Sequence, residues 1–249
     1  QTGGKIEGTG EKDLANTRLL AYLPIASHRA PRSFLAIGLG TGVTLASAKE
    51  HMAEVSMVEI NSGVVEAIDK FGPPGLLKGV DITVQDARNY LFLSEKRFDI
   101  ISSEPSYPTE ASTANLFTRE FYELAATRLN EGGVFCQWLP YYALSNRDAT
   151  MMLKTFGSVF SHVSLWKAPK GFDLLMIGST EPFLFSAGEI QERVSVLNRS
   201  KDPLDFMLSR EPGQVREIVK TEEAVPLNTD DRPFLEFHAA RNFITGVKD

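Results

Sequence analysis

Short apolar runs alternate with helix-like segments along the first part of this chain. Five runs have the length and continuity of buried strands: 33–37, 54–60, 80–84, 98–102 and 133–138. Helical patterns occur before and between them, at 13–27, 42–51, 62–71, 87–93 and 117–129. This alternation is typical of a parallel sheet with helices on both faces. We therefore predict an α/β fold of the Rossmann-like, methyltransferase type, with a mostly parallel sheet.

The C-terminal part of the chain has a different pattern. After a helix at 146–158, Val163–Trp166 and Asp173–Ile177 predict an antiparallel hairpin that closes the sheet edge. We expect short helices over 186–220 and a tail of loop and extended chain from Val225.

Three parts follow: an N-terminal loop and helix at 1–31, a Rossmann-like domain at 32–180, and a C-terminal helical lobe and tail at 181–249. Within the second part, Gly132-Gly133 predicts a stop after the helix that ends near Leu129.

Charge and composition narrow the classes of partner. The formal net charge of −6 argues against a nucleic-acid partner, because phosphate binding needs a clustered cationic face. The four histidines lack ligand spacing, and the single cysteine, Cys136, lies in an apolar run. We therefore expect no metal site, no disulfide within the chain and a buried strand cysteine.

No apolar stretch reaches the length of a membrane span, and no signal peptide opens the chain. We expect a soluble domain in the cytoplasm. The start at Gln1, without a methionine, indicates either a trimmed chain or a domain cut from a longer protein.

The glycine-rich turn Gly38-Leu39-Gly40-Thr41-Gly42 follows the first strand and opens a helix. Glycines let the backbone turn sharply and approach a ligand, and the start of a helix favours polar or anionic groups. The alternative is a tight turn without a ligand. We take Gly38, Gly40, Thr41 and Gly42 as candidate nucleoside contacts.

Acidic residues end the next two strands. Glu59 lies at the distance from the glycine turn where a carboxylate can accept both ribose hydroxyls of a nucleoside. Asp86, followed by the small residue Ala87, can accept from an adenine amino group while the backbone N–H donates to the ring. The alternative for Asp86 is a helix cap, and the two roles are compatible.

Glu104 follows the fourth strand and should face the same cleft, because ligands of open α/β sheets bind outside the carboxyl ends of strands. It can act as a general base or hold an ammonium group. The alternative is a loop carboxylate in water. The proline-containing segment around Tyr107 suits a wall over the substrate. We take Glu104 and Tyr107 as the candidate catalytic residues.

The order of these motifs, together with Leu116-Phe117-Thr118-Arg119-Glu120-Phe121-Tyr122, resembles the spermidine/spermine synthase family, the polyamine aminopropyltransferases. The resemblance covers roughly residues 11–180. It implies binding of decarboxylated S-adenosylmethionine, transfer of its aminopropyl group to an amine, and release of methylthioadenosine. Glu59 would hold the ribose, Asp86 and Ala87 the adenine, and the glycine turn the aminopropyl-sulfonium end.

Three positions depart from the family pattern. Thr41 stands in place of an acidic residue in the glycine turn, Tyr107 in place of the second carboxylate after the fourth strand, and Asn16-Thr17-Arg18 in place of a Tyr-His-Glu stretch. Aminopropyl transfer needs carboxylates that grip and activate the amine. The nucleoside half of the site is therefore expected to be intact, and the amine half altered.

Glu104-Pro105-Ser106, Gln137-Trp138-Leu139 and residues 228–234 are similar to spermidine-synthase-like domains attached to membrane-transporter-like segments. That resemblance implies a membrane-embedded segment in the longer protein, and the family implies a homodimer. Residues 228–234 either line the site or form a structural turn, with Asp231 and Arg232 in a surface network.

Three functions stay open at this point. The first is aminopropyl transfer to an unidentified small-molecule amine. The second is a methyltransferase that uses S-adenosylmethionine, because Thr41 and Arg18 are easier to reconcile with a nucleoside that keeps its carboxylate. The third is a non-catalytic nucleoside-binding domain of a larger membrane protein.

Overall fold

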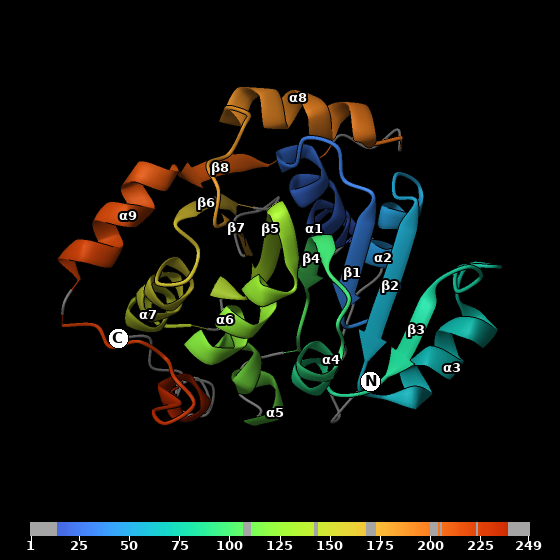
Figure 1. Cartoon of the computed structure of the whole chain (residues 1–249), viewed down its shortest axis with the longest axis horizontal. Helices are drawn as coiled ribbons and strands as arrows, with labels where there is room; N and C mark the ends of the chain where they lie inside the picture. The colour runs from blue at the N-terminus through green and yellow to red at the C-terminus, as the bar shows by residue number, and fades with distance from the viewer. Residues whose placement is uncertain are drawn as a thin grey trace.

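The computed structural model describes residues 14–106, 111–141, 144–167, 173–199, 204, 206–222 and 224–238. Its centre is an eight-stranded sheet in the order β3-β2-β1-β4-β5-β7-β6-β8 (Figure 1). The strands are β1 Ser33–Ile37, β2 Glu54–Glu59, β3 Asp81–Val84, β4 Phe98–Ser103, β5 Leu129–Leu139, β6 His162–Lys167, β7 Leu174–Ser179 and β8 Met207–Arg210. The pairs among β1 to β5 are parallel, and the pairs that involve β7 or β8 are antiparallel. The predicted mostly parallel sheet with an antiparallel hairpin is confirmed.

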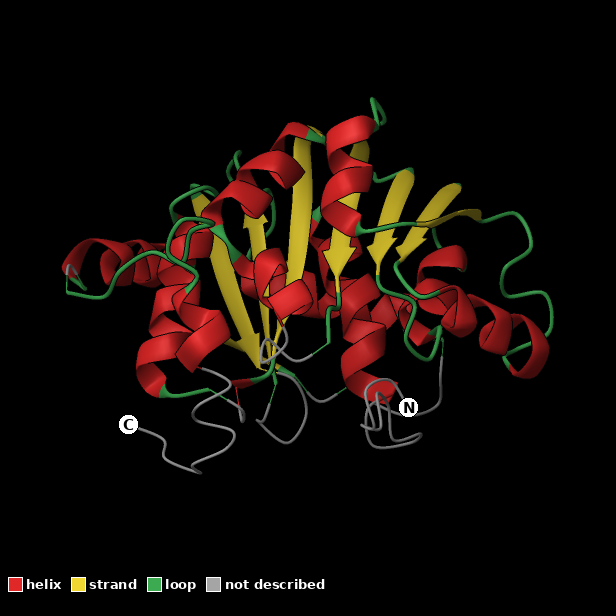
Figure 2. Cartoon of the chain, turned by 90° about the horizontal axis from the view of Figure 1, so that it is seen from below, coloured by secondary structure: helices red, strands yellow, loops and turns green. Residues whose placement is uncertain are grey.

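Helices pack around this sheet (Figure 2). They are α1 Leu14–Ser27, α2 Val43–Lys49, α3 Ser62–Phe71, α4 Ala87–Leu93, α5 Ala111–Ala114, α6 Arg119–Thr127, α7 Asn146–Gly157, α8 Ala187–Leu197 and α9 Pro212–Thr221, with a 3-10 turn η2 at Asn115–Phe117. In the described part of the chain, no helix has the length and apolar character needed to cross a membrane.

The stop predicted at Gly132-Gly133 is wrong. Helix α6 ends at Thr127, and β5 already begins at Leu129, so both glycines lie inside the strand. Gly132 has a left-handed backbone with φ of 71°. The pairing of β4 with β5 shifts register between Phe98 and Ile100 at this point. A glycine inside a strand can mark such an irregularity as readily as a helix end.

The helices predicted over 186–220 are interrupted by a strand. Residues 207–210 form β8, which pairs with β6 and extends the sheet beyond the predicted hairpin. Leu208 packs against the core next to Trp166. Tertiary packing therefore overrides local pattern here. The tail was expected to lack helix, yet residues 234–238 are helical.

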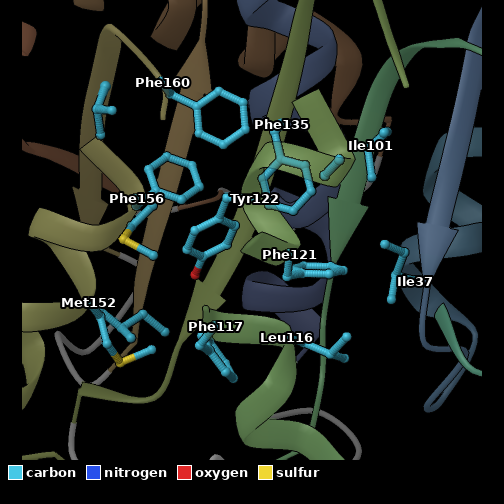
Figure 3. Packing of buried hydrophobic residues seen from close by; sticks show 14 of the residues in the cluster. Ile37, Ile101, Leu116, Phe117, Phe121, Tyr122, Phe135, Met152, Phe156 and Phe160 are labelled. Atoms are coloured by element: carbon cyan, nitrogen blue, oxygen red, sulfur yellow. The ribbon is translucent and has the colours of Figure 1, made fainter. Parts of the chain in front are cut away.

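Two apolar layers lie on opposite faces of the sheet. One contains α1 residues such as Leu20 and Leu23 together with Cys136 of β5. Burial raises the pKa of the Cys136 thiol. The other is rich in aromatic rings, with Tyr122 and Phe156 edge to face at 5.0 Å and Phe135 beside them (Figure 3). Neighbouring residues of β5 thus serve different cores, because strand side chains alternate in direction.

Candidate active site

The predicted site residues gather where the parallel strands end. Ile37 at the end of β1 pairs with Val58 of β2 on one side and with Ser103 of β4 on the other. The glycine turn therefore lies between Glu59 and Glu104. The arrowheads of β1 and β2 point to this edge at the bottom of Figure 1. Tyr107, the second predicted catalytic residue, lies outside the described residues.

Two glycines of the turn are required by the fold itself. Gly38 has φ of 87°, and a Cβ there would lie 2.7 Å from the carbonyl oxygen of Glu104. Gly42 has φ of 78°, and its Cβ would lie 2.7 Å from Leu76. Gly40, at φ of 49°, has no atom within 4 Å of its Cβ position, and Thr41 is exposed. Gly40 and Thr41 are thus the part of the turn that faces open space.

The carboxylate of Glu59 is held by two backbone N–H groups. Its Oε2 accepts from the N–H of Leu39, and its Oε1 from the N–H of Asn61, each at 2.9 Å. The residue is 9% exposed. Each carboxylate oxygen can accept a second hydrogen bond. The carboxylate is therefore held in one orientation while it keeps acceptor sites for a ligand.

Asp86 caps α4, as one of the two interpretations predicted. Its side chain accepts from the N–H of Asn89 at 3.0 Å, and this bond uses one carboxylate oxygen. Ala87 is the first residue of α4, and its methyl group is buried in the core.

Two exposed apolar side chains flank Glu59 and were not predicted as site residues. Ile60, directly after β2, is 62% exposed, and Val84, paired with Glu59, is 49% exposed. Both are apolar residues at the carboxyl end of a strand, which is the sequence signal for them. Each offers exposed apolar surface near the carboxylate.

Glu104 faces the first two helices. The hydroxyl of Thr44 lies 2.9 Å from Oε2 of Glu104 and 2.9 Å from the carbonyl oxygen of Thr17. One hydroxyl proton is thus placed between two acceptors. Thr44 of α2 and Thr17 of α1 connect Glu104 to both helices.

A further carboxylate at this edge, Asp173, was not predicted as a site residue. It lies one residue before β7 and is 9% exposed. Its Oδ2 accepts from the side-chain amide of Asn16. Its Oδ1 accepts from the indole N–H of Trp138 at 3.1 Å. A charged residue at the start of an apolar strand is the only sequence signal, since its partners are far away in the chain.

Three buried side-chain oxygens near this edge have no hydrogen-bond partner within the described residues: Asn16 Oδ1, Ser103 Oγ and Gln137 Oε1. Ser103 and Gln137 are register partners at the ends of β4 and β5. An unpaired buried polar group costs about 1–3 kcal/mol. Such groups are rare in folded proteins and are found where a ligand or water completes the site.

Residues 228–234 form a structural clasp. Asn228 is buried; its side-chain amide donates to the carbonyl oxygen of Phe117 at 3.0 Å, and its side-chain oxygen accepts from the N–H of Leu235 at 3.2 Å. Arg88 donates twice to Asp230, at 2.8 and 2.5 Å. This hydrogen bond lowers the pKa of Asp230 and raises that of Arg88.

The structural interpretation of that segment therefore holds in a modified form. Its ion pair is made by Asp230, next to the predicted pair Asp231 and Arg232, which are exposed. Because Arg88 belongs to α4, the clasp holds the helix that Asp86 caps.

A cavity of about 310 Å³ lies behind the exposed part of the glycine turn. Thr41, Arg18 of α1 and Glu50 are among the side chains that line it. Arg18 therefore lies close to the glycine turn.

The fold and the arrangement at the sheet edge define a Rossmann-like domain of the methyltransferase type. The family model described as the spermine/spermidine synthase domain matches residues 13–190. The chain belongs to this family.

Curated relatives agree with this assignment. The chain is 29% identical over 172 residues to the polyamine aminopropyltransferase of Pectobacterium carotovorum subsp. carotovorum (strain PC1), and 27% identical over 172 residues to that of Sodalis glossinidius (strain morsitans). Each match covers 66% of this chain and 60% of the relative. The chain thus spans about 60% of the length of these relatives.

Solved structures show the same fold. A spermidine synthase in complex with the transition state analogue AdoDATO has a TM-score of 0.65 at 20% identity, covering 84% of this chain and 72% of that one. The spermidine synthase from Thermotoga maritima has a TM-score of 0.64 at 22% identity, covering 85% and 73%. Human methyltransferase-like protein 13 in complex with SAH has a TM-score of 0.57 at 16% identity, covering 78% and 94%.

Proposed function

We propose that this chain binds decarboxylated S-adenosylmethionine and transfers its aminopropyl group to a small aliphatic amine, with release of methylthioadenosine. The observation that carries the proposal is the carboxylate of Glu59, held by the N–H groups of Leu39 and Asn61 beside the glycine turn. The family to which the chain belongs supports the same reaction.

The nucleoside would lie along the ends of β1, β2 and β3. Glu59 accepts the two ribose hydroxyls with its remaining lone pairs. The free carboxylate oxygen of Asp86 accepts from the adenine amino group, and the N–H of Ala87 donates to the ring. Ile60 and Val84 supply apolar surface to the base. Gly40 and Thr41 face the sulfonium end, where open space lies next to the turn.

Glu104 is the proposed general base. The amine lone pair attacks the carbon next to sulfur, the carbon–sulfur bond breaks, and its electron pair neutralises the sulfonium. The proton that the amine loses goes to the carboxylate of Glu104. The hydroxyl of Thr44, at 2.9 Å, orients that carboxylate. Tyr107 is proposed as a second contact of the amine.

Methyl transfer from S-adenosylmethionine is the second candidate, and one observation favours it. Arg18 and Thr41 line the same cavity at the glycine turn. A guanidinium beside a neutral hydroxyl suits a nucleoside that keeps its carboxylate. The two candidates differ in which nucleoside binds more tightly.

Methylthioadenosine release decides between them. The protein is incubated with decarboxylated S-adenosylmethionine and a mixture of di- and polyamines, and the products are weighed by mass spectrometry. Amine-dependent release supports the proposal, and the product mass identifies the acceptor. Tighter binding of the carboxylated nucleoside together with methylated products favours the second candidate. Binding without any product indicates a nucleoside-binding module.

Two expectations rest on the family resemblance alone. They are a membrane-embedded segment in a longer protein and a homodimer. Both remain proposals.

A further inference from the structure

We propose that Asp173, positioned by Asn16 and Trp138, binds the ammonium group at the far end of the acceptor amine and so selects diamines over monoamines. This inference rests on the proposed function, because it concerns the acceptor of the same transfer. It adds a carboxylate that the sequence motifs do not mark as part of the site.

The topology places Asp173 and Glu104 at one edge of the sheet. Glu104 directly follows β4, and Asp173 directly precedes the antiparallel strand β7. In the sheet order β4-β5-β7, one strand separates them. Two strand spacings amount to about 10 Å. A chain of a few methylenes fills that gap once a charge-assisted hydrogen bond of about 2.8 Å is made at each end.

Helix α1 is linked to both Glu104 and Asp173. Asn16 donates to Asp173, and the carbonyl oxygen of the next residue, Thr17, shares the hydroxyl of Thr44 with Glu104. Consecutive residues of α1 are therefore linked to the proposed base and to the proposed ammonium receptor. A substrate held between the two carboxylates would lie against this turn of α1.

A buried acceptor beside Asp173 points to a ligand that donates hydrogen bonds. Asn16 is 9% exposed, and its Oδ1 has no hydrogen-bond partner within the described residues. The Nδ2 of the same amide is already bound to Asp173. An ammonium group carries three N–H donors and a positive charge. It can donate to the amide oxygen and to the carboxylate together, and its charge complements that of the carboxylate, which a neutral donor does not match and an anion opposes.

Trp138 completes the arrangement. Its indole N–H holds Oδ1 of Asp173 at 3.1 Å, so the carboxylate is oriented by two donors from different elements. The indole ring is partly buried and packs against the core on the α1 face. Aromatic faces attract alkylammonium groups and pack against methylenes. The ring thus fits an aliphatic chain that ends in an ammonium group.

The test compares diaminobutane with butylamine, which lacks the second nitrogen. Each is titrated by calorimetry into the wild type and into D173N, with and without methylthioadenosine. We expect the wild type to prefer diaminobutane, and D173N to bind it on the order of tenfold to a hundredfold more weakly. Butylamine should bind both proteins equally.

Asp99→Asn is the matched control. Asp99 is also a partly buried carboxylate bound by several donors, among them the side-chain amide of Asn130 at 2.8 Å, but it lies near the start of β4, at the opposite edge of the sheet. D99N should leave the preference for diaminobutane unchanged. Thermal unfolding of every variant verifies that it is folded.

A second variant keeps the inference testable if D173N does not fold. N16A removes the unpaired oxygen and one donor to Asp173, and should also reduce the preference for diaminobutane. Equal affinity of wild type and folded D173N for diaminobutane would overturn the inference, as would a wild type that does not distinguish the two amines. Absence of methylthioadenosine release with every amine would instead overturn the proposed function, because calorimetry needs no turnover.

Discussion

The two halves of the site are built differently. In the proposed nucleoside half, Glu59 and Asp86 accept hydrogen bonds from backbone N–H groups, so the orientation of each carboxylate is set within the chain. In the proposed amine half, the buried Oδ1 of Asn16 has no partner among the described residues, and the same holds for Ser103 Oγ and Gln137 Oε1 at the nearby ends of β4 and β5. The proposed nucleoside half is thus oriented by contacts within the chain, whereas the proposed amine half keeps a buried acceptor that a bound donor could pair.

This difference suits the chemistry of a transfer reaction. Groups that are fixed in advance lower the cost of binding a rigid nucleoside. Acceptors left open are satisfied when a donor enters, so an amine that reaches them is favoured over a shorter analogue that leaves them unpaired.

Replacement of Glu104 by glutamine should have the largest effect. The amide cannot accept the proton, and loss of a general base reduces the rate by about 10²–10⁴-fold. Nucleoside affinity should stay within a few-fold of the wild type, because Glu59 and Asp86 are untouched. Steady-state release of methylthioadenosine and a separate nucleoside titration measure the two quantities. Unchanged turnover would remove Glu104 from the mechanism.

Replacement of Glu59 by glutamine addresses the nucleoside half. We expect nucleoside binding to weaken by about 2 kcal/mol, since hydrogen bonds to a charged group are lost. Glu54→Gln is the control, because Glu54 is an exposed carboxylate at the other end of the same strand. Calorimetry with methylthioadenosine gives both values. Equal affinity of the E59Q variant and the control would show that Glu59 does not hold the ribose.

The unliganded stabilities of Asp86→Ala and Ser103→Ala should change in opposite directions. Loss of the Asp86 cap costs about 1 kcal/mol. Loss of the unpaired Ser103 hydroxyl relieves a buried polar group and should raise the free energy of unfolding, by about 1 kcal/mol. Urea unfolding of the two variants provides the comparison. A destabilised S103A protein would mean that the Ser103 hydroxyl is already paired in the unliganded protein.

Removal of the ion pair in the clasp should have the smallest effect on stability, and that effect should depend on pH. The hydrogen bond from Arg88 lowers the pKa of Asp230 below its ordinary value. The ion pair therefore stabilises the fold fully above the ordinary carboxyl pKa of about 4, and this stabilisation is lost as the pH falls through the lowered pKa of Asp230. Both side chains are partly exposed, so the contribution is roughly 0.5–1 kcal/mol.

The measurement compares the urea midpoints of wild type and D230N at neutral pH and at about pH 3. At neutral pH the wild type should have the higher urea midpoint. The difference between the two midpoints should shrink in acid. A difference that grows in acid would contradict a stabilising ion pair between Arg88 and Asp230.

Local pattern predicted well the elements that carry the proposed nucleoside half. The strands, the glycine turn and the helix after Asp86 follow from apolar runs and capping residues that lie close together in sequence. Asp173 could not be found in this way, because its partner Asn16 is 157 positions away in the chain. The same limit hid β8, whose pairing with β6 is decided by packing rather than by its own residues. Gly132 misled the prediction because glycine serves both helix ends and strand irregularities.

The burial of Cys136 has a practical consequence. It is the single cysteine of the chain, and burial raises the pKa of its thiol, so the reactive thiolate is scarce and shielded. A cysteine introduced at an exposed position such as Val196 on α8 would therefore react alone with a maleimide dye or spin label. The native chain accepts site-specific probes without prior removal of a cysteine.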